Sequence, residues 1–193
     1  VTLAIKRWAC GPFCACCPAR HAVVASLART LGSTNPMSPA LVVEPLAKHT
    51  GLVPLLAEWF ICEWPGWYGA GGQGNVAQDL QNFAASQTTL PVGFVVFGDG
   101  TPVGAGALKA ESIPSHKHLT PWAGAGFVVP EYRGQGIGAV LLRSMVAHAR
   151  ALGYPHVYCG TSTAESLLQR SGWSAIEVTQ HAGKPLTVFR SAA

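Results

Sequence analysis

A glycine-rich run between an apolar segment and an amphipathic segment is the feature that most limits how this chain can fold. Residues 132–142 read YRGQGIGAVLL and follow the apolar residues 126–129. This order predicts a strand, a tight turn and a helix. Glycines let backbone N–H groups approach a ligand closely, and the start of a helix adds unpaired donors and a positive dipole end. The turn therefore suits a phosphate or diphosphate, with Arg133 adding a charge and a two-pronged donor.

Two nucleotide-binding motifs compete with this interpretation, and both fit poorly. Residues 134–139 satisfy the dinucleotide pattern G-x-G-x-x-A. That motif requires an acidic residue about 20 positions further on, where residues 154–157 read YPHV. A nucleotide P-loop requires Gly-Lys-Ser/Thr, which does not follow the turn. A glycine-rich connection that binds no ligand remains as the plain alternative.

A third pattern fits the turn and the segment after it. Arg133-x-x-Gly136-x-Gly138 resembles the R/Q-x-x-G-x-G/A signature of the GNAT superfamily of acyl-CoA-dependent N-acyltransferases. Residues 161–173, TSTAESLLQRSGW, resemble the family's second landmark, N-x-x-A-x-x-L-Y-E-K-x-G-F. Residues of the same type as in the landmark stand at the corresponding positions Ala164, Arg170, Gly172 and Trp173. The resemblance covers about residues 41–193, and it implies an acetyltransferase that uses acetyl-CoA as co-substrate.

Periodicity and turn residues predict the element order β-α-α-β-β-β-α-β-α-β-β, which is also the order of the GNAT fold. This is an α/β (α+β) fold with a central mixed, mostly antiparallel β-sheet flanked by helices. The strands are expected at 41–43, 91–97, 102–110, 121–129, 154–160, 173–180 and 186–190, and the helices at 49–64, 75–85, 136–152 and 163–171.

Composition limits the partners. With 193 residues, 49% of them hydrophobic and 11% charged, the chain is long and apolar enough for one domain with a real core. A net charge of +4 without a basic stripe suits an anionic cofactor, and we expect no nucleic-acid partner. No apolar run reaches the ~18 residues of a membrane span, so we expect no membrane partner. The expected state is a cytoplasmic monomer or homodimer.

Residues 1–40 differ from the rest and are expected to form a separate N-terminal extension and linker, followed by the acetyltransferase domain at 41–193. The extension is rich in cysteine, and residues 32–39 are rich in Ser, Thr, Asn and Pro. Cys14-x-x-Cys17 has no second pair and is a weak metal signal, so no metal site is expected.

The resemblance implies where acetyl-CoA binds. In the family, the strand before the turn pairs with the pantetheine arm and supplies a backbone N–H to the thioester oxygen as it becomes an oxyanion. That strand corresponds to residues 127–129 here. The residues expected to bind the cofactor are Phe127, Val128, Val129, Arg133, Gly134, Gln135, Gly136, Ile137, Gly138, Ala139 and Thr161.

The acceptor amine must lose a proton, because lysine-like amines have a pKa near 10.4. Glu63 and His118 are the candidate bases, with Glu111 a further possibility. Glu63 lies in a run, EWPGWY, that corresponds to the acceptor side in the family, and we expect it across the site from the turn. A solvated helix-end carboxylate and a surface histidine are the plain alternatives. The residues expected to contact the acceptor are Glu63, Trp64, Trp67, Tyr68 and Trp122.

One departure from the family bears on catalysis. The tyrosine that protonates the leaving thiolate corresponds to Leu168, which cannot donate a proton, and the landmark asparagine corresponds to Thr161. Because a thiol has a pKa of about 8.5, the thiolate is already a fair leaving group. Tyr158 or a water molecule could replace the tyrosine. The alternative function is a non-catalytic CoA-binding or regulatory module of the same fold.

Overall fold

The computed structural model describes residues 40–181 and 183–192. The predicted cysteine-rich extension and its linker lie outside the described residues, and so do Cys14 and Cys17.

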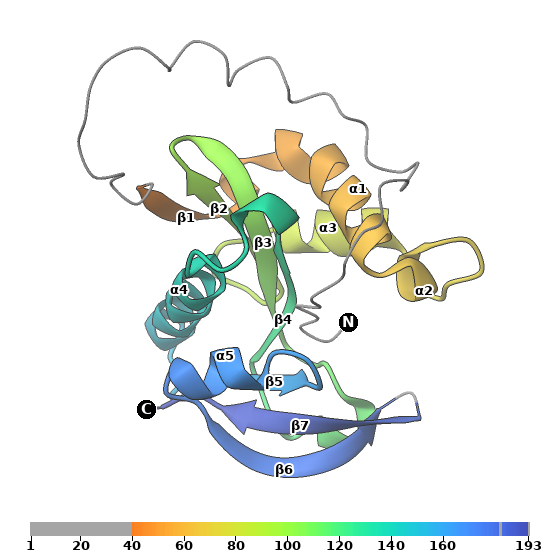
Figure 1. The fold of residues 1–193 in the computed structure, drawn as a ribbon, viewed down its shortest axis with the longest axis vertical. Helices are drawn as coiled ribbons and strands as arrows, with labels where there is room; N and C mark the ends of the chain where they lie inside the picture. Colours follow the sequence, from red (N-terminus) through yellow and green to blue (C-terminus); the bar gives the residue numbers. More distant parts are fainter. Residues whose placement is uncertain (1–39, 182, 193) are drawn as a thin grey trace. The chain divides into compact units, whose positions relative to one another are not determined.

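A single seven-stranded sheet organises the described part of the chain, in the order β1-β2-β3-β4-β5-β7-β6 (Figure 1). Neighbouring strands are antiparallel except for β4 and β5, which are parallel. This confirms the predicted mixed, mostly antiparallel sheet. The strands are β1 Leu41–Pro45, β2 Val92–Gly98, β3 Thr101–Lys109, β4 Trp122–Val128, β5 Tyr158–Thr161, β6 Ser174–His181 and β7 Lys184–Arg190.

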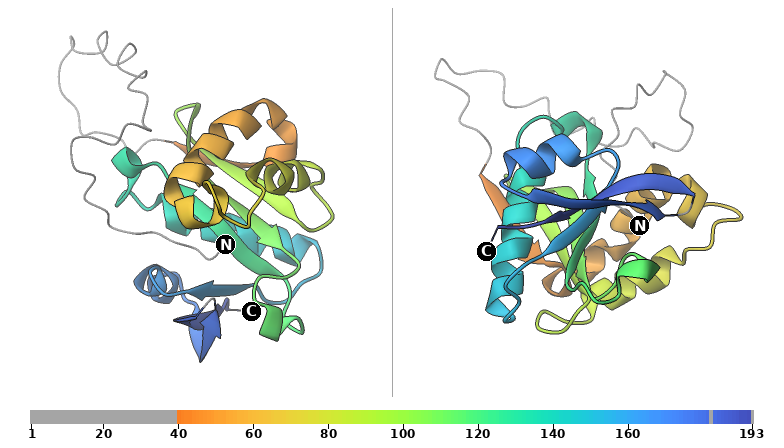
Figure 2. Two further views of the ribbon diagram at one scale, coloured as in Figure 1. Left: turned by 90° about the vertical axis from the view of Figure 1, so that its right-hand side faces the viewer. Right: turned by 90° about the horizontal axis from the view of Figure 1, so that it is seen from below.

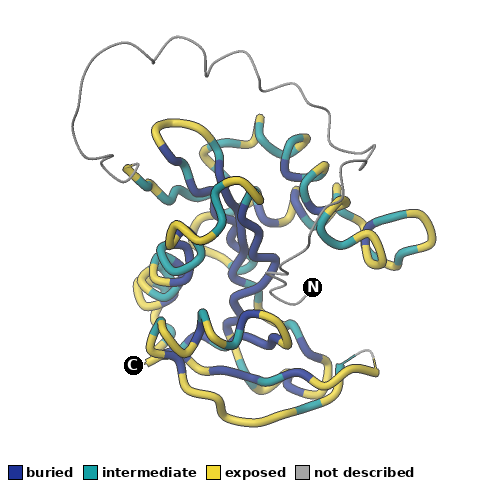
Figure 3. Tube along the Cα trace, in the orientation of Figure 1, coloured by how far each residue is buried: buried dark blue, intermediate teal, exposed yellow. Residues whose placement is uncertain are grey.

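Helices cover both faces of the sheet (Figure 2). They are α1 Val53–Glu63, α2 Pro65–Tyr68, α3 Val76–Ala84, α4 Ile137–Ala151 and α5 Glu165–Arg170. Leu56 and Phe60 of α1 pack with α3 on one face, whereas Leu141 and Met145 of α4 pack with Leu168 of α5 on the other. The central strands lie between these two layers and are the most buried of the described residues (Figure 3).

The main differences from the predicted boundaries lie at the first helix, at Pro65 and at β5. The first helix begins at Val53 and not at His49, because His49 has the non-helical angles φ −133° and ψ 43°. Pro65 does not end the helical region but begins the short helix α2, in the first-turn position that proline favours. Strand β5 begins at Tyr158 and not at Tyr154, so it has only four residues.

Strand β4 is paired unequally along its two edges. Toward β3, Ala105 pairs with Phe127 and Ala107 with Gly124, so two residues of β4 oppose one residue of β3 in a bulge. Ala125 lies in this bulge with φ +50°. Toward β5 the only register pair is Trp122 with Tyr158, and the two strands diverge beyond it (Figure 1). The edge of residues 123–128 that faces β5 therefore has no strand partner in the described chain.

Candidate active site

The turn between β4 and α4 presents backbone donors to open space. Gly134 and Gly136 both have φ +82°, which L-residues with side chains rarely adopt. A Cβ built on either glycine would meet no atom within 4 Å. Among the described residues, the N–H groups of Gly134, Gln135 and Gly136 have no hydrogen-bond partner, and the first turn of α4 adds further unpaired donors. This geometry fits an anion such as a diphosphate.

An apolar cavity adjoins this turn. It lies between the end of β4, α4 and α5, and Gly138, in the first turn of α4 directly after the glycine-rich turn, is part of its wall. Of the predicted cofactor residues, Phe127, Val128 and Gly138 line it. The full lining is Gly126, Phe127, Val128, Gly138, Leu141, Leu142, Met145 and Leu167. No sequence signal marked Leu141, Leu142, Met145 and Leu167 as site residues, because helical spacing does not separate a cavity wall from a core face.

The backbone hydrogen bonds of β4 indicate which N–H group is available to stabilise an oxyanion. The Val129 N–H donates to the Val103 carbonyl at 3.0 Å and is therefore engaged. Because successive residues of a strand point their N–H groups to opposite edges, the Val128 N–H lies on the edge that faces β5. The Val128 carbonyl agrees with this, because it accepts a hydrogen bond from Arg133 Nε at 2.8 Å and not from β3.

The second family landmark, residues 161–173, has a structural role in this chain. The buried Thr161 Oγ1 accepts hydrogen bonds from the N–H of Thr163 at 3.1 Å and of Ala164 at 2.9 Å, which fixes the entry to α5. Leu168 is fully buried in the core, and its neighbour Leu167 is the α5 residue that reaches the cavity. Neither leucine can donate a proton. The role of Thr161 toward a cofactor stays a prediction.

Arg133 and Glu63 contact each other directly. Arg133 Nη2 donates to Glu63 Oε2 at 3.0 Å, and the two side chains are 22% and 14% exposed. Glu63 ends α1, so this contact joins α1 to the turn. The expectation that Glu63 lies across the site from the turn is therefore wrong. Residues 70 positions apart meet here, and no local pattern signals such a contact.

The aromatic residues that were predicted to contact the acceptor form one group, and Trp122 does not belong to it. The rings of Trp64 and Tyr68 lie against Phe60 of α1, with centroid distances of 4.9 and 6.2 Å. The Tyr68 hydroxyl donates to Asp79 Oδ2 at 2.6 Å, and burial together with this carboxylate raises the pKa of Tyr68 above its usual value. Trp67 is 40% exposed. The buried Trp64 Nε1 has no acceptor among the described residues.

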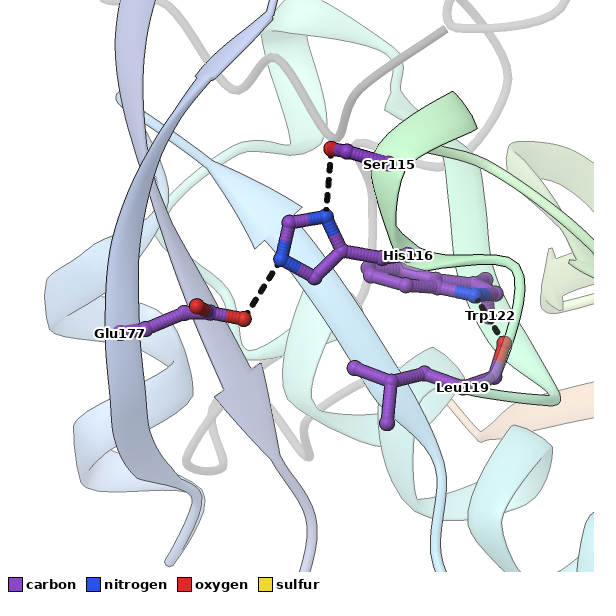
Figure 4. Close-up of polar contacts among 5 residues, drawn as sticks. All are labelled: Ser115, His116, Leu119, Trp122 and Glu177. Carbon is purple, nitrogen blue, oxygen red and sulfur yellow. Dashed lines mark hydrogen bonds and ion pairs between the residues drawn. The ribbon is translucent and has the colours of Figure 1, made fainter.

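Trp122 lies in a separate cluster at the point where β4 and β5 meet. It is fully buried with Ile113, Leu186 and Val188, and its Nε1 donates to the Leu119 carbonyl at 2.6 Å (Figure 4). The structure therefore does not bring Trp122 together with the aromatic side chains of α1 and α2. Its predicted contact with the acceptor stays untested.

The loop before β4 holds two histidines in different environments. His118 is exposed, whereas His116 is buried. His116 Nε2 donates to Glu177 Oε1 of β6 at 2.6 Å, and Ser115 Oγ contacts its Nδ1 at 2.8 Å (Figure 4). The two imidazole rings lie 5.9 Å apart. The sequence analysis missed Glu177, which is 61 positions away from His116.

Three further findings concern Glu111, metal binding and membrane-spanning helices. Glu111, the third base candidate, is exposed, and its carboxylate lies 3.7 Å from Lys117 Nζ. Within residues 40–181 and 183–192, no group of three His, Cys, Asp or Glu side chains is arranged to hold a metal ion. No helix of this part of the chain is both long and apolar enough to cross a membrane.

Comparison with known proteins identifies the family and the fold. Residues 53–172, more than half of the chain, match the family described as acetyltransferase (GNAT) family. An aminoglycoside 6'-N-acetyltransferase complexed with coenzyme A superposes with a TM-score of 0.63 at 12% identity, over 78% of this chain and 96% of that one. None of the curated proteins matches the sequence.

Two further solved structures are similar. A putative acetyltransferase from Salmonella typhimurium with its cofactor acetyl-CoA has a TM-score of 0.57 at 16% identity, over 79% of this chain and 94% of that one. A spermidine N-acetyltransferase chimera from Vibrio cholerae has a TM-score of 0.58 at 13% identity, over 79% and 95%. At these identities the likeness concerns the fold.

Proposed function

The chain belongs to the acetyltransferase (GNAT) family, and from this we propose that it moves an acetyl group from acetyl-CoA to a primary amine by direct attack in a ternary complex. One observation carries the proposal. A turn with unbonded N–H groups and two left-handed glycines adjoins an apolar cavity below an unpaired strand edge. An anionic diphosphate attached to a long, mostly apolar arm suits this combination.

Each part of acetyl-CoA has a matching part of the chain. We assign the diphosphate to the N–H groups of residues 134–138, where the positive end of α4 favours negative charge. The pantetheine arm is assigned to the free edge of β4, with which its amides can pair as an added strand does, and its apolar atoms to the apolar lining beside Gly138 and Leu167. When bound, acetyl-CoA supplies an activated acetyl group.

The residues of the chain then act on the attacking amine and the developing charge. The amine attacks the thioester carbonyl carbon, a C–N bond forms, and the C–S bond breaks. We assign stabilisation of the oxyanion to the Val128 N–H, because this donor is fixed before the reaction and faces the unpaired edge. Leu167 and Leu168 offer no acid, so the thiolate leaves unassisted by α5, which its pKa of about 8.5 permits.

For removal of the amine proton, His118 is favoured over Glu63. His118 is exposed and its ring contacts that of His116, so an acceptor can reach it. Glu63 is largely buried and already accepts a hydrogen bond from Arg133. A general base must come within hydrogen-bond reach of the proton that it takes. Glu63 is therefore poorly placed to take this proton. His118 lies in the loop that enters β4 at Trp122, six residues before Val128, so its role is tested by the pH–rate profile and not by a contact in the structure.

The acceptor is proposed to be a primary amine on a small molecule or peptide. Trp64, Trp67 and Tyr68 provide aromatic rings near the carboxylate of Asp79, and ammonium groups bind favourably to such faces. The similar structures include proteins named for the acetylation of aminoglycosides and of spermidine, which are both amines. These names support the class of acceptor and not its identity.

A thiol-release assay tests the function. The full chain is incubated with acetyl-CoA and, in turn, spermidine, an aminoglycoside and a peptide with a free N-terminus. We expect free thiol and a singly acetylated product, seen by mass spectrometry, with at least one amine. Tight binding of CoA without release for any amine would contradict catalysis and support the non-catalytic module.

A further inference from the structure

Four side chains form a continuous contact between α1 and the cofactor side of the site. They are Trp59 and Glu63 of α1, Phe127 of β4 and Arg133 of the turn, and we call them the α1–turn cluster. The rings of Trp59 and Phe127 have centroids 5.1 Å apart, and Arg133 Cζ lies 5.8 Å from the Phe127 ring centroid. The ion pair between Arg133 and Glu63 completes the set.

The spacing on α1 explains why one helix reaches two cofactor-side elements. Trp59 and Glu63 are four residues apart, so they lie on the same face of the helix. Trp59 contacts the strand that ends at the turn, and Glu63 contacts the turn itself through Arg133. The position of the turn is therefore tied to the position of α1.

Arg133 is held in one orientation by this arrangement. Its Nε donates to the Val128 carbonyl at 2.8 Å, and its Nη2 donates to Glu63 at 3.0 Å. Both partners of the ion pair are largely buried, at 22% and 14% exposure. Removing the charge of one partner would leave the other charge poorly compensated in a partly desolvated place.

We infer that Glu63 is a positioning residue, which sets the diphosphate-binding turn through Arg133 and so makes the affinity for CoA depend on α1. The inference rests on the proposed function of the turn. Trp64, the next residue after Glu63, belongs to the aromatic group assigned to the acceptor. The acceptor side and the cofactor side therefore share a structural support at the end of α1.

A different role for the same ion pair predicts the opposite change in the affinity for CoA. If Glu63 merely occupied Arg133 until a diphosphate displaced it, removing the carboxylate would free Arg133 and remove a nearby negative charge. CoA would then bind more tightly. In the positioning account, removing the carboxylate loosens the turn, and CoA binds more weakly. The sign of the change in affinity therefore separates the two accounts.

The test compares Glu63→Gln with Glu58→Gln in the full chain. Glu58 is an exposed carboxylate of the same helix, so its replacement makes the same change in net charge. We expect calorimetry to show a Kd for CoA that rises about fivefold or more in Glu63→Gln, a scale typical of coupled sites, and that stays unchanged in Glu58→Gln. The melting temperature of each variant shows whether it is folded. An unchanged or lower Kd in Glu63→Gln would overturn the inference.

A second measurement separates this inference from the proposed function. Amide hydrogen exchange of residues 134–138 in the free chain should be faster in Glu63→Gln than in Glu58→Gln. A double variant, Glu63→Gln with Arg133→Met, should bind CoA no more weakly than Arg133→Met alone. If the two substitutions weakened binding independently, so that their fold-changes in the Kd for CoA multiplied in the double variant, the inference would be overturned. A wild-type chain that binds no CoA would refute the proposed function, whereas unchanged exchange in Glu63→Gln would refute the positioning role itself.

Discussion

The turn between β4 and α4 is built from residues that are neighbours in the chain, whereas the contacts that join this turn and the loop before β4 to other elements link residues far apart. The turn depends on the left-handed conformations of Gly134 and Gly136 and on the first turn of α4. Two such contacts pair Glu63 with Arg133 and His116 with Glu177, which are 70 and 61 positions apart. The difference teaches that the backbone of the turn can be specified by one short motif, whereas its support by other elements needs the whole fold.

The largest effect is expected from the local region. Gly136→Val places a β-branched side chain at φ +82°, directly above the unbonded N–H groups. We expect binding of CoA to fall below detection in calorimetry. Gly100→Val is the matched control, because Gly100 has φ +78° and equally open surroundings in the β2–β3 turn. Equal loss of binding in both variants would show that backbone strain, and not the turn itself, causes the effect.

A large effect is also expected on the acceptor side, but on turnover and not on CoA affinity. If His118 is the base, His118→Gln should lower kcat/KM by ~10²–10⁴-fold near neutral pH. The rate should recover partly at high pH, because the free amine accumulates as the solution approaches its pKa near 10.4. Glu63→Gln should leave the shape of the pH–rate profile unchanged. The reverse pattern would make Glu63 the base.

An intermediate effect is expected where the two regions meet. Arg133→Ala removes a charge and two directional hydrogen bonds at the turn, so it should weaken binding of CoA by about 1.5–3 kcal/mol. Arg143→Ala, on the exposed side of α4, removes the same charge and should change the affinity little. Calorimetry measures both. Similar losses in both variants would point to general electrostatic attraction and would remove the special role of Arg133.

The smallest effect concerns the bridge between the loop before β4 and β6. His116→Ala removes the contacts to Glu177 and Ser115, and should lower the free energy of unfolding by about 1–2 kcal/mol, because Glu177 is 45% exposed and partly solvated. His118→Ala is the control, and its stability should stay close to that of the wild type. Urea unfolding at neutral pH measures both. Unchanged stability in His116→Ala would show that the bridge is dispensable.

The same contrast explains what the sequence could predict. The element order depends on patterns of neighbouring residues, and the structure confirms it apart from the additional short helix α2. The details behind this order are local, since Asn75 Oδ1 accepts from the Gln78 N–H at the start of α3, and Asp99 and Gly100 form the β2–β3 turn with positive φ. The start of α1 and the length of β5 could not be placed as well. A 3-10 turn at Thr50–Leu52 replaces the expected first helical turn, and the single register pair between β4 and β5 leaves little to fix where β5 begins.

The candidate site divides in the same way. The turn and its glycines could be found from one motif, because their geometry is local. The position of Glu63 was predicted wrongly, because its partner Arg133 belongs to a different part of the chain. Glu177 gave no signal at all, since a lone carboxylate on an edge strand resembles any solvated side chain. Trp122 was grouped with other aromatics by residue type, whereas the fold buries it elsewhere.

Titration of CoA into isotope-labelled full chain, followed by amide chemical shifts, tests the central claim most directly. The account predicts saturable shifts at residues 134–138 and along residues 123–128 of β4, with little change at the β2–β3 turn around Gly100. Saturable binding that shifts other amides and leaves residues 134–138 unchanged would contradict the claim that this turn holds the cofactor.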